Sequence, residues 1–214
     1  MSELIDNRAH RVRQLKAIIK HLHEGRSPGE VKGLLKKIVG ETDYSEIVAM
    51  EQELMAEGMP VEEIRSMCDL HSQVTREVMV QLQPPAVPPG HPIDTMRREN
   101  QALREAVERA RRAMAAINAL PDDADAGEAL LAWRQAYNDL MDIEKHYQRK
   151  EHAFFPKLEA HGITGPSKVM WAKDDEVRAM LKVLGAELAG QGNAAHWKAV
   201  AAGAGRRALD AVEE

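Results

Sequence analysis

Carboxylates interrupt the apolar face of one long predicted helix in this sequence. Counting from Glu151 in alternating steps of three and four residues gives a stripe that is apolar apart from Glu144 and Glu151. The stripe contains Leu130, Trp133, Tyr137, Leu140, Glu144, Tyr147, Glu151, Phe154 and Leu158. A buried carboxylate is unfavourable unless a metal ion or a basic side chain neutralises it. These positions are therefore candidates for a metal site or a buried ion pair.

A second predicted helix repeats this pattern, with Asp174 among apolar residues. Its stripe contains Met170, Asp174, Val177, Leu181, Leu184 and Leu188. A carboxylate in the middle of such a stripe suits a hard metal ion, or an ion pair with Arg or Lys from the helix predicted over residues 94–118. The spacing is compatible with both interpretations.

The histidine that accompanies these acids is His146, five residues before Glu151. Five residues turn an α-helix through about 140°, so the two side chains would border one site or serve two metal ions. The alternative is that His146 packs at the flank of the helix beside Glu144 or Lys150. For Glu144 itself, an ion pair is favoured over a metal ion.

Asp94 is a further candidate, with a simpler alternative. It follows Pro92 near a predicted helix start, where an acid caps free N–H groups and interacts with the helix dipole, worth about 1 kcal/mol. Cys68 and His71 have the spacing of half a zinc site, but the sequence contains no second pair. A buried thiol beside a hydrogen-bonded histidine is therefore favoured for those two residues.

Composition restricts the class of protein. The 214 residues carry a formal net charge of -5, which argues against a general nucleic-acid binder. No apolar run reaches the roughly 18 residues of a transmembrane helix, and the N-terminus has no signal-peptide core. Cys68 is the only cysteine, so no intrachain disulfide can form and a cytoplasmic location is expected.

Helical periodicity runs through the chain, which predicts an all-α fold. Five prolines between residues 83 and 92 predict a stiff, extended connector. We expect a small N-terminal helical domain over residues 1–82, a proline-rich linker over 83–92 and an antiparallel four-helix bundle over 93–214. The predicted helices cover residues 8–23, 27–40, 44–57 and a stretch from 60 before the linker, then 94–118, 126–161, 168–189 and a stretch from 193.

The last predicted helix is the weakest. It contains Gly203 and Gly205, and each glycine in a helix costs roughly 1 kcal/mol relative to alanine. We expect its amides to exchange with solvent faster than those of the other bundle helices. Its apolar face offers little beyond Trp197, Val200, Leu209 and Val212.

The stretch from His146 to Pro156 resembles the H-x-x-x-[EK]-E-x-x-x-F-P signature of the hemerythrin-like HHE cation-binding domains. The string from Gly162 to Arg178 (GITGPSKVMWAKDDEVR) is similar to one subgroup of that family, in which a small helical domain of unknown function precedes the bundle. Similarity extends to the first half and the junction, through residues 21–25, 50–54, 57–64, 90–93 and 98–100. The resemblance therefore covers nearly the whole chain and implies a hemerythrin-like bundle.

The resemblance also implies metal ligands on all four helices, usually for a non-haem di-iron centre. The histidines that the family carries on its first and third helices correspond here to Asp94 and Asp174. The acidic Phe-Pro segment of the fourth helix would begin near Glu214, so we expect a short, truncated last helix. Weak or absent occupancy by iron or another divalent metal is expected. The candidate ligands are His146, Glu151, Asp174, Asp94 and Glu144.

Two classes of function follow from this resemblance. The first is a cation-binding protein, with non-haem iron, that senses, binds or stores a small oxidant such as O2 or NO. The alternative is a metal-free helical interaction or regulatory module with a degenerate metal site, acting as a homodimer or through a regulatory protein partner. Neither nucleic acid nor a membrane is an expected partner. No substrate is indicated, so an enzyme is the less favoured class.

Overall fold

The computed structural model describes residues 10, 13, 14, 17, 49, 52–54, 56–58 and 86–213. The described residues form helices, turns and connecting segments without a strand, which confirms the predicted all-α fold. Before the linker, the described residues at 10, 13, 14 and 17, and at 49, 52–54 and 56, are helical as predicted. The helices predicted over 27–40 and from 60 lie outside the described residues, as do Cys68 and His71.

Gly58 ends the helical stretch that contains Leu54. Its φ of 91° lies in the left-handed region, which glycine adopts without strain. The N–H of Glu57 donates to the carbonyl oxygen of Glu53 at 2.9 Å and closes the last turn. Leu54 is buried.

The chain divides into two compact units. The first contains residues 1–85 and 155–170, and the second contains residues 86–154 and 171–214. Residues 155–170, here called the hairpin, include α8 (Phe155–Ala160) and the first turns of α9 (Gly165–Leu188). The second unit contains all the predicted ligand positions.

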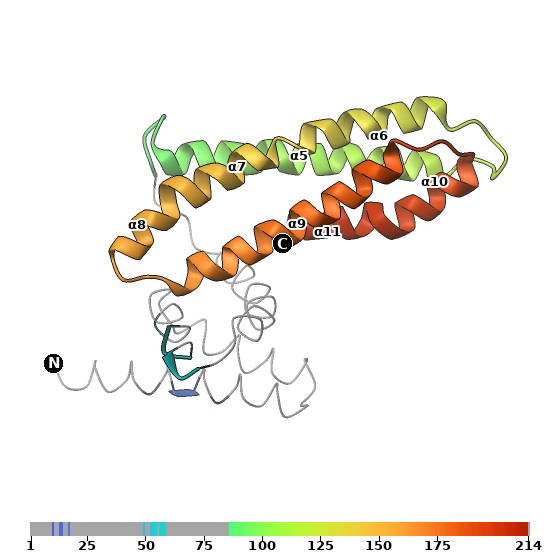
Figure 1. Ribbon diagram of the computed structural model, residues 1–214. Helices are drawn as coiled ribbons and strands as arrows, with labels where there is room; N and C mark the ends of the chain where they lie inside the picture. The colour runs from blue at the N-terminus through green and yellow to red at the C-terminus, as the bar shows by residue number, and fades with distance from the viewer. Residues whose placement is uncertain are drawn as a thin grey trace. The chain divides into compact units, whose positions relative to one another are not determined.

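The bundle helices run back and forth in an antiparallel arrangement (Figure 1). The first is α5 (Pro92–Asn118), and the second comprises α6 (Gly127–Leu140), α7 (Ile143–Arg149), a π-helical segment (Lys150–Phe154) and α8. The third is α9, and the fourth comprises α10 (Ala194–Val200), a π-helical segment (Ala201–Gly205) and α11 (Arg206–Glu213). In the second unit, α5 packs against α6, α7, α10 and α11. This arrangement confirms the predicted four-helix bundle.

Local capping explains where these helices begin. His91 is the N-cap of α5, and its Nδ1 accepts a hydrogen bond from the N–H of Ile93 at 3.1 Å. Pro92 fits the first turn because a proline has no N–H to leave unpaired there. Asn193 caps α10 by accepting a hydrogen bond from the N–H of His196 at 3.1 Å. The predicted linker thus loses its last residue to α5.

The second bundle helix is interrupted, although the sequence predicts one continuous helix from 126 to 161. A tight turn separates α6 from α7, and in it the N–H of Glu144 donates to the carbonyl oxygen of Met141 at 3.2 Å. Hydrogen bonds between residues three apart wind the chain more tightly than α-helical ones, which advances the following residues around the axis. Ile143 is therefore buried, and Glu144, predicted to point inward, is only half-buried.

The π-helical segment Lys150–Phe154 shifts the pattern a second time. A π-helical turn holds more residues than an α-helical turn, so the residues after it are delayed around the axis. Phe155 is consequently buried, whereas Phe154, the residue that simple counting selects, is half-buried. Glu151 lies inside the widened turn and is buried, as predicted.

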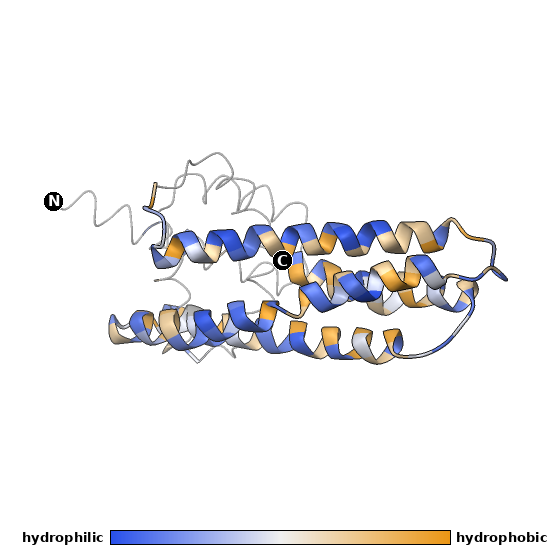
Figure 2. Cartoon of the chain, turned by 90° about the horizontal axis from the view of Figure 1, so that it is seen from above, coloured by the Kyte–Doolittle hydropathy of each residue, from blue (hydrophilic) through white to orange (hydrophobic). Residues whose placement is uncertain are grey.

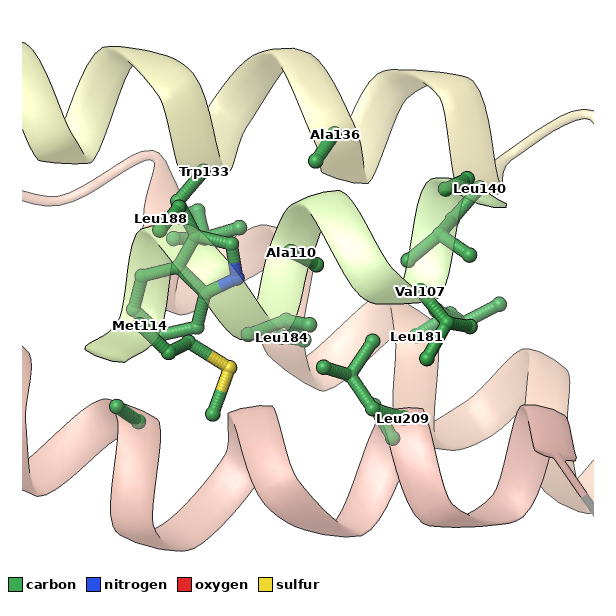
Figure 3. Packing of buried hydrophobic residues seen from close by; sticks show 14 of the residues in the cluster. Val107, Ala110, Met114, Trp133, Ala136, Leu140, Leu181, Leu184, Leu188 and Leu209 are labelled. Carbon is green, nitrogen blue, oxygen red and sulfur yellow. The ribbon is translucent and has the colours of Figure 1, made fainter. Parts of the chain in front are cut away.

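Apolar side chains from all four helices fill the centre of the bundle. Figure 3 shows Trp133 of α6 beside Met114 of α5, with Leu184 and Leu188 of α9 close by. Burying each such leucine contributes roughly 1.5–3 kcal/mol of hydrophobic free energy. The stripe predicted for α9 is confirmed from Asp174 onward. Its buried members are Asp174, Val177, Leu181, Leu184 and Leu188.

Every bundle helix carries both polar and apolar residues along its length (Figure 2). Such helices bury one stripe against their neighbours and expose the opposite face to water. Within the part of the chain that the structure describes, no helix has the length and apolar character needed to span a membrane.

Gly205 has a packing role that helix propensity does not predict. A Cβ atom at this position would lie 2.7 Å from Cζ2 of Trp133, which is fully buried and has no room to move. A Cβ atom at Gly203 would meet nothing within 4 Å. Gly205 therefore permits a close approach between helices, whereas Gly203 only weakens its own helix.

Replacing Gly203 with alanine is expected to raise the free energy of unfolding by about 0.5–1 kcal/mol, because alanine is the better helix former. The matched Gly205→Ala variant should lower it by roughly 1–3 kcal/mol, because the added methyl group overpacks the core. Urea unfolding of both variants measures the difference. Changes of the same sign would contradict the roles assigned to the two glycines.

Candidate functional site

Two cationic side chains, those of Lys150 and Arg178, lie over the ring of Tyr147 in α7. Nζ of Lys150 lies 4.7 Å from the centroid of this ring, and Cζ of Arg178 lies 5.2 Å from it. Both distances are within the range of a cation–π attraction. Burial is the main cause of the raised pKa of Tyr147, and the nearby charge of Asp174 raises it further. The phenol therefore stays neutral at physiological pH.

Arg178 of α9 is the central cation. Its Nη1 and Nη2 atoms donate to Glu151 at 2.9 and 3.1 Å, and its Nε and Nη2 atoms donate to Glu144 at 2.8 and 3.2 Å. A fifth bond runs from Nη1 to Asp175 at 2.9 Å. A guanidinium group has five N–H donors, so all of them are used here. The hydrogen bonds to Glu144 and Glu151 raise the pKa of Arg178 still further, and the cation is permanent.

The two glutamates that share Arg178 differ in burial. Glu151 is 5% exposed, whereas Glu144 is half-buried at the edge of the group. The hydrogen bonds from Arg178 lower the pKa of Glu144, which keeps it ionised. Water can replace part of this stabilisation at Glu144 but very little at Glu151. The charge of Glu151 therefore depends most on Arg178.

Asp174 is the most deeply buried acid of the bundle, with 2% of its surface exposed. Its Oδ1 accepts a hydrogen bond from Nζ of Lys150 at 2.6 Å, and its Oδ2 has no partner among the described residues. Burial raises the pKa of Asp174 to about 6, although Lys150 acts in the opposite direction. The ionised form is therefore less favourable in the folded chain than in the unfolded chain.

His146 belongs to a separate ion-pair group with Glu99 of α5. Its Nδ1 lies 3.1 Å from Oε2 of Glu99, and Arg149 pairs with the other oxygen of the same carboxylate. Burial outweighs Glu99 and lowers the pKa of His146, so its neutral form is favoured. A histidine held by a carboxylate through one ring nitrogen has a fixed orientation.

Asp94 has local partners in the first turn of α5. Its Oδ2 accepts hydrogen bonds from the N–H of Gly90 at 3.0 Å and from Nη2 of Arg98 at 2.7 Å. The Gly90 N–H is the main reason why the pKa of Asp94 is lowered. This geometry agrees with the interpretation of Asp94 as a first-turn acid.

The candidate ligands have different partners in the structure. Glu144 and Glu151 share Arg178, whereas Asp174 has a separate cation. His146 uses Glu99, a residue that the sequence did not single out. Asp174 forms an ion pair, which was one of the two interpretations of its position, but its cation is Lys150 of the second bundle helix and not a residue of the first.

One of these two cations, Arg178, has a signal in the sequence. Arg178 follows Asp174 by four residues, so the two lie on neighbouring turns of one helix face. Lys150 directly precedes Glu151, and both belong to the π-helical segment, in which consecutive side chains lie closer together around the axis than in an α-helix. Periodicity finds the first relationship but has no information on the second.

The donor groups do not fit a metal ion in this arrangement. Both oxygens of Glu144 and of Glu151 accept from Arg178, and Oδ1 of Asp174 accepts from Lys150. The described part of the chain contains no group of three or more His, Cys, Asp or Glu side chains that could hold a metal ion. Two side-chain cations neutralise the acids that a metal would need as ligands.

Two family models match the sequence. Residues 91–213 match the family described as Hemerythrin HHE cation binding domain, and residues 15–81 match a family of unknown function, DUF438. No curated protein and no solved structure matches the chain. The longer match covers the bundle that carries these ion pairs.

Proposed function

Because the chain belongs to the hemerythrin HHE cation-binding family, we propose that it is a hemerythrin-type module whose polar centre is closed by its own side-chain cations. Membership of that family supports a cation-binding role. In this chain the side chains of Lys150 and Arg178 take the place of a bound cation, because they neutralise the buried acids. The bundle then serves as a helical regulatory or interaction module, with a protein as its partner.

The main support for this proposal is that every N–H donor of the Arg178 guanidinium group makes a hydrogen bond. Its five hydrogen bonds leave no oxygen of Glu151 or Glu144 without a charged partner. A divalent ion at the same carboxylates would stand close to a fixed positive charge, and like charges repel strongly where water is scarce. The arrangement therefore favours the metal-free module over a metal centre.

A second candidate function is a site for non-haem iron in a protein that senses, binds or stores a small oxidant such as O2 or NO. The Oδ2 atom of Asp174, which has no hydrogen-bond partner in the described part of the chain, favours it, because a buried carboxylate oxygen without a partner is uncommon. The ligand positions in this case are His146, Glu151, Asp174, Asp94 and Glu144. A reducing compartment such as the cytoplasm suits ferrous iron.

Metal titration separates the two candidates. We expect the melting temperature of the metal-stripped chain to be unchanged by ferrous iron, zinc or manganese, and freshly purified protein to contain far less than one metal per chain. A ligand at a hundred times its dissociation constant stabilises a fold by about 2.7 kcal/mol, so a real site would raise the melting temperature by several degrees.

The variants His146→Ala and Glu151→Ala serve as controls for that experiment. If a metal raises the melting temperature of the unmodified chain, and both variants abolish the rise, the metal-free module is wrong and the second candidate replaces it. A rise that survives both substitutions would indicate adventitious binding elsewhere on the chain.

A further inference from the structure

The hairpin of residues 155–170 contains buried apolar side chains that are not part of the bundle core. Phe155 is 1% exposed and Val169 is 5% exposed. Neither belongs to the apolar cluster at the centre of the bundle. A fully buried residue typically touches roughly six or more other residues. The two helical stretches of the hairpin can cover a side chain only on the sides that they contact. Another part of the chain must therefore contribute to their burial.

That part lies in the first unit. The hairpin forms one compact unit with residues 1–85, not with the remainder of the bundle. Nε2 of Gln52 donates a hydrogen bond to the carbonyl oxygen of Gly162 at 2.5 Å. Gly162 lies at the tip of the hairpin, where a φ of 78° turns the chain between α8 and α9. Ala49, three residues before Gln52 and on the same helix face, is half-buried.

We propose that the hairpin is a docking surface for the chain's own residues 49–58. The carbonyl group of Gly162 accepts the hydrogen bond from Gln52, and in this proposal the apolar side chains of Phe155 and Val169 lie beneath the docked segment. The docked segment comes from the same chain as the hairpin, because both belong to one compact unit of that chain.

The hairpin continues directly into the helices that carry the ion pairs, so this docking couples the N-terminal half to them. This extension rests on the proposed function. Lys150 precedes Phe155 by five residues, and Asp174 follows Val169 by five. A partner that captures residues 49–58 would release the hairpin, and the helices on both sides of the Lys150–Asp174 pair would lose that support.

Two valines of α9 provide a matched test in the full-length chain. Val169→Ser should accelerate amide hydrogen exchange in residues 49–58 by about ten-fold or more, because a buried apolar contact is lost. Exchange in α6 should stay unchanged. Val183 is 51% exposed on the same helix, so Val183→Ser should change neither region. Unchanged exchange in 49–58 for Val169→Ser, or equal acceleration for Val183→Ser, would overturn the proposal.

A cross-link decides the matter if Val169→Ser does not fold. Gln52→Cys and His161→Cys are combined with Cys68→Ser, and the dilute protein is treated with a short bismaleimide. We expect a link within one chain, and none for the control pair Gln52→Cys and Ala186→Cys. A link between two chains would assign the hairpin to a second copy and overturn intramolecular docking. The exchange and cross-linking results do not depend on metal binding, so both tests are independent of the metal titration.

Discussion

Replacing Arg178 with alanine is expected to lower the free energy of unfolding by about 3–5 kcal/mol, because it leaves a buried carboxylate without its cation. Glu151 is almost fully buried and receives two hydrogen bonds from this arginine. Glu144 loses its bonds as well, but it is partly hydrated and contributes less. Urea unfolding at pH 7 measures the change.

Arg112 offers a control of the same residue type. Its pair with Glu108 is 3.7 Å long and exposed on both sides, so Arg112→Ala should change the stability by less than about 0.5 kcal/mol. Adding Glu151→Leu to Arg178→Ala should recover much of the lost stability, because it removes the uncompensated charge. Equal effects of Arg178→Ala and Arg112→Ala would show that the arginine is not the cation of the buried site.

The Lys150→Met variant is expected to lose about 3 kcal/mol of stability, because Asp174 keeps its burial but loses its cation. The double variant Lys150→Met with Asp174→Leu should be at least as stable as the unmodified chain. Replacing a buried ion pair by apolar side chains of similar volume is often neutral or stabilising by about 1–4 kcal/mol. Thermal and urea unfolding of the two variants test this contrast. Additive losses in the double variant would contradict it.

The pH dependence of stability provides an independent measurement on Asp174. Its pKa is raised from 3.8 to about 6 in the folded chain, so the folded state retains a proton that the unfolded state has already lost between these values. The contribution of Asp174 is therefore most favourable at low pH and declines as the pH rises through this window, by about 3 kcal/mol in total. Asp174→Asn does not titrate, so its stability relative to the unmodified chain should rise over the same window. A constant difference between the two would contradict the raised pKa.

Periodicity alone determined most of the architecture. The all-α fold, the bundle helices and the buried stripe of α9 follow from apolar residues three and four apart, because a helix with one apolar face is stable only when that face is covered. The same count identified Glu151 and Asp174 as buried acids, since a carboxylate within such a stripe shares the burial of its neighbours. The family resemblance rests on these residues as well.

The tertiary structure decided which groups neutralise the acids. Arg178 and Lys150 reach Glu151 and Asp174 because two helices lie side by side, and Lys150 and Glu151 both belong to the π-helical segment Lys150–Phe154. Sequence spacing describes a regular helix, so it misplaced Glu144, which follows a tight turn. Pairing between side chains on different helices depends on distances of a few ångströms across the bundle. Local spacing fixes which face a residue lies on, whereas only the packing of helices fixes which partner it meets.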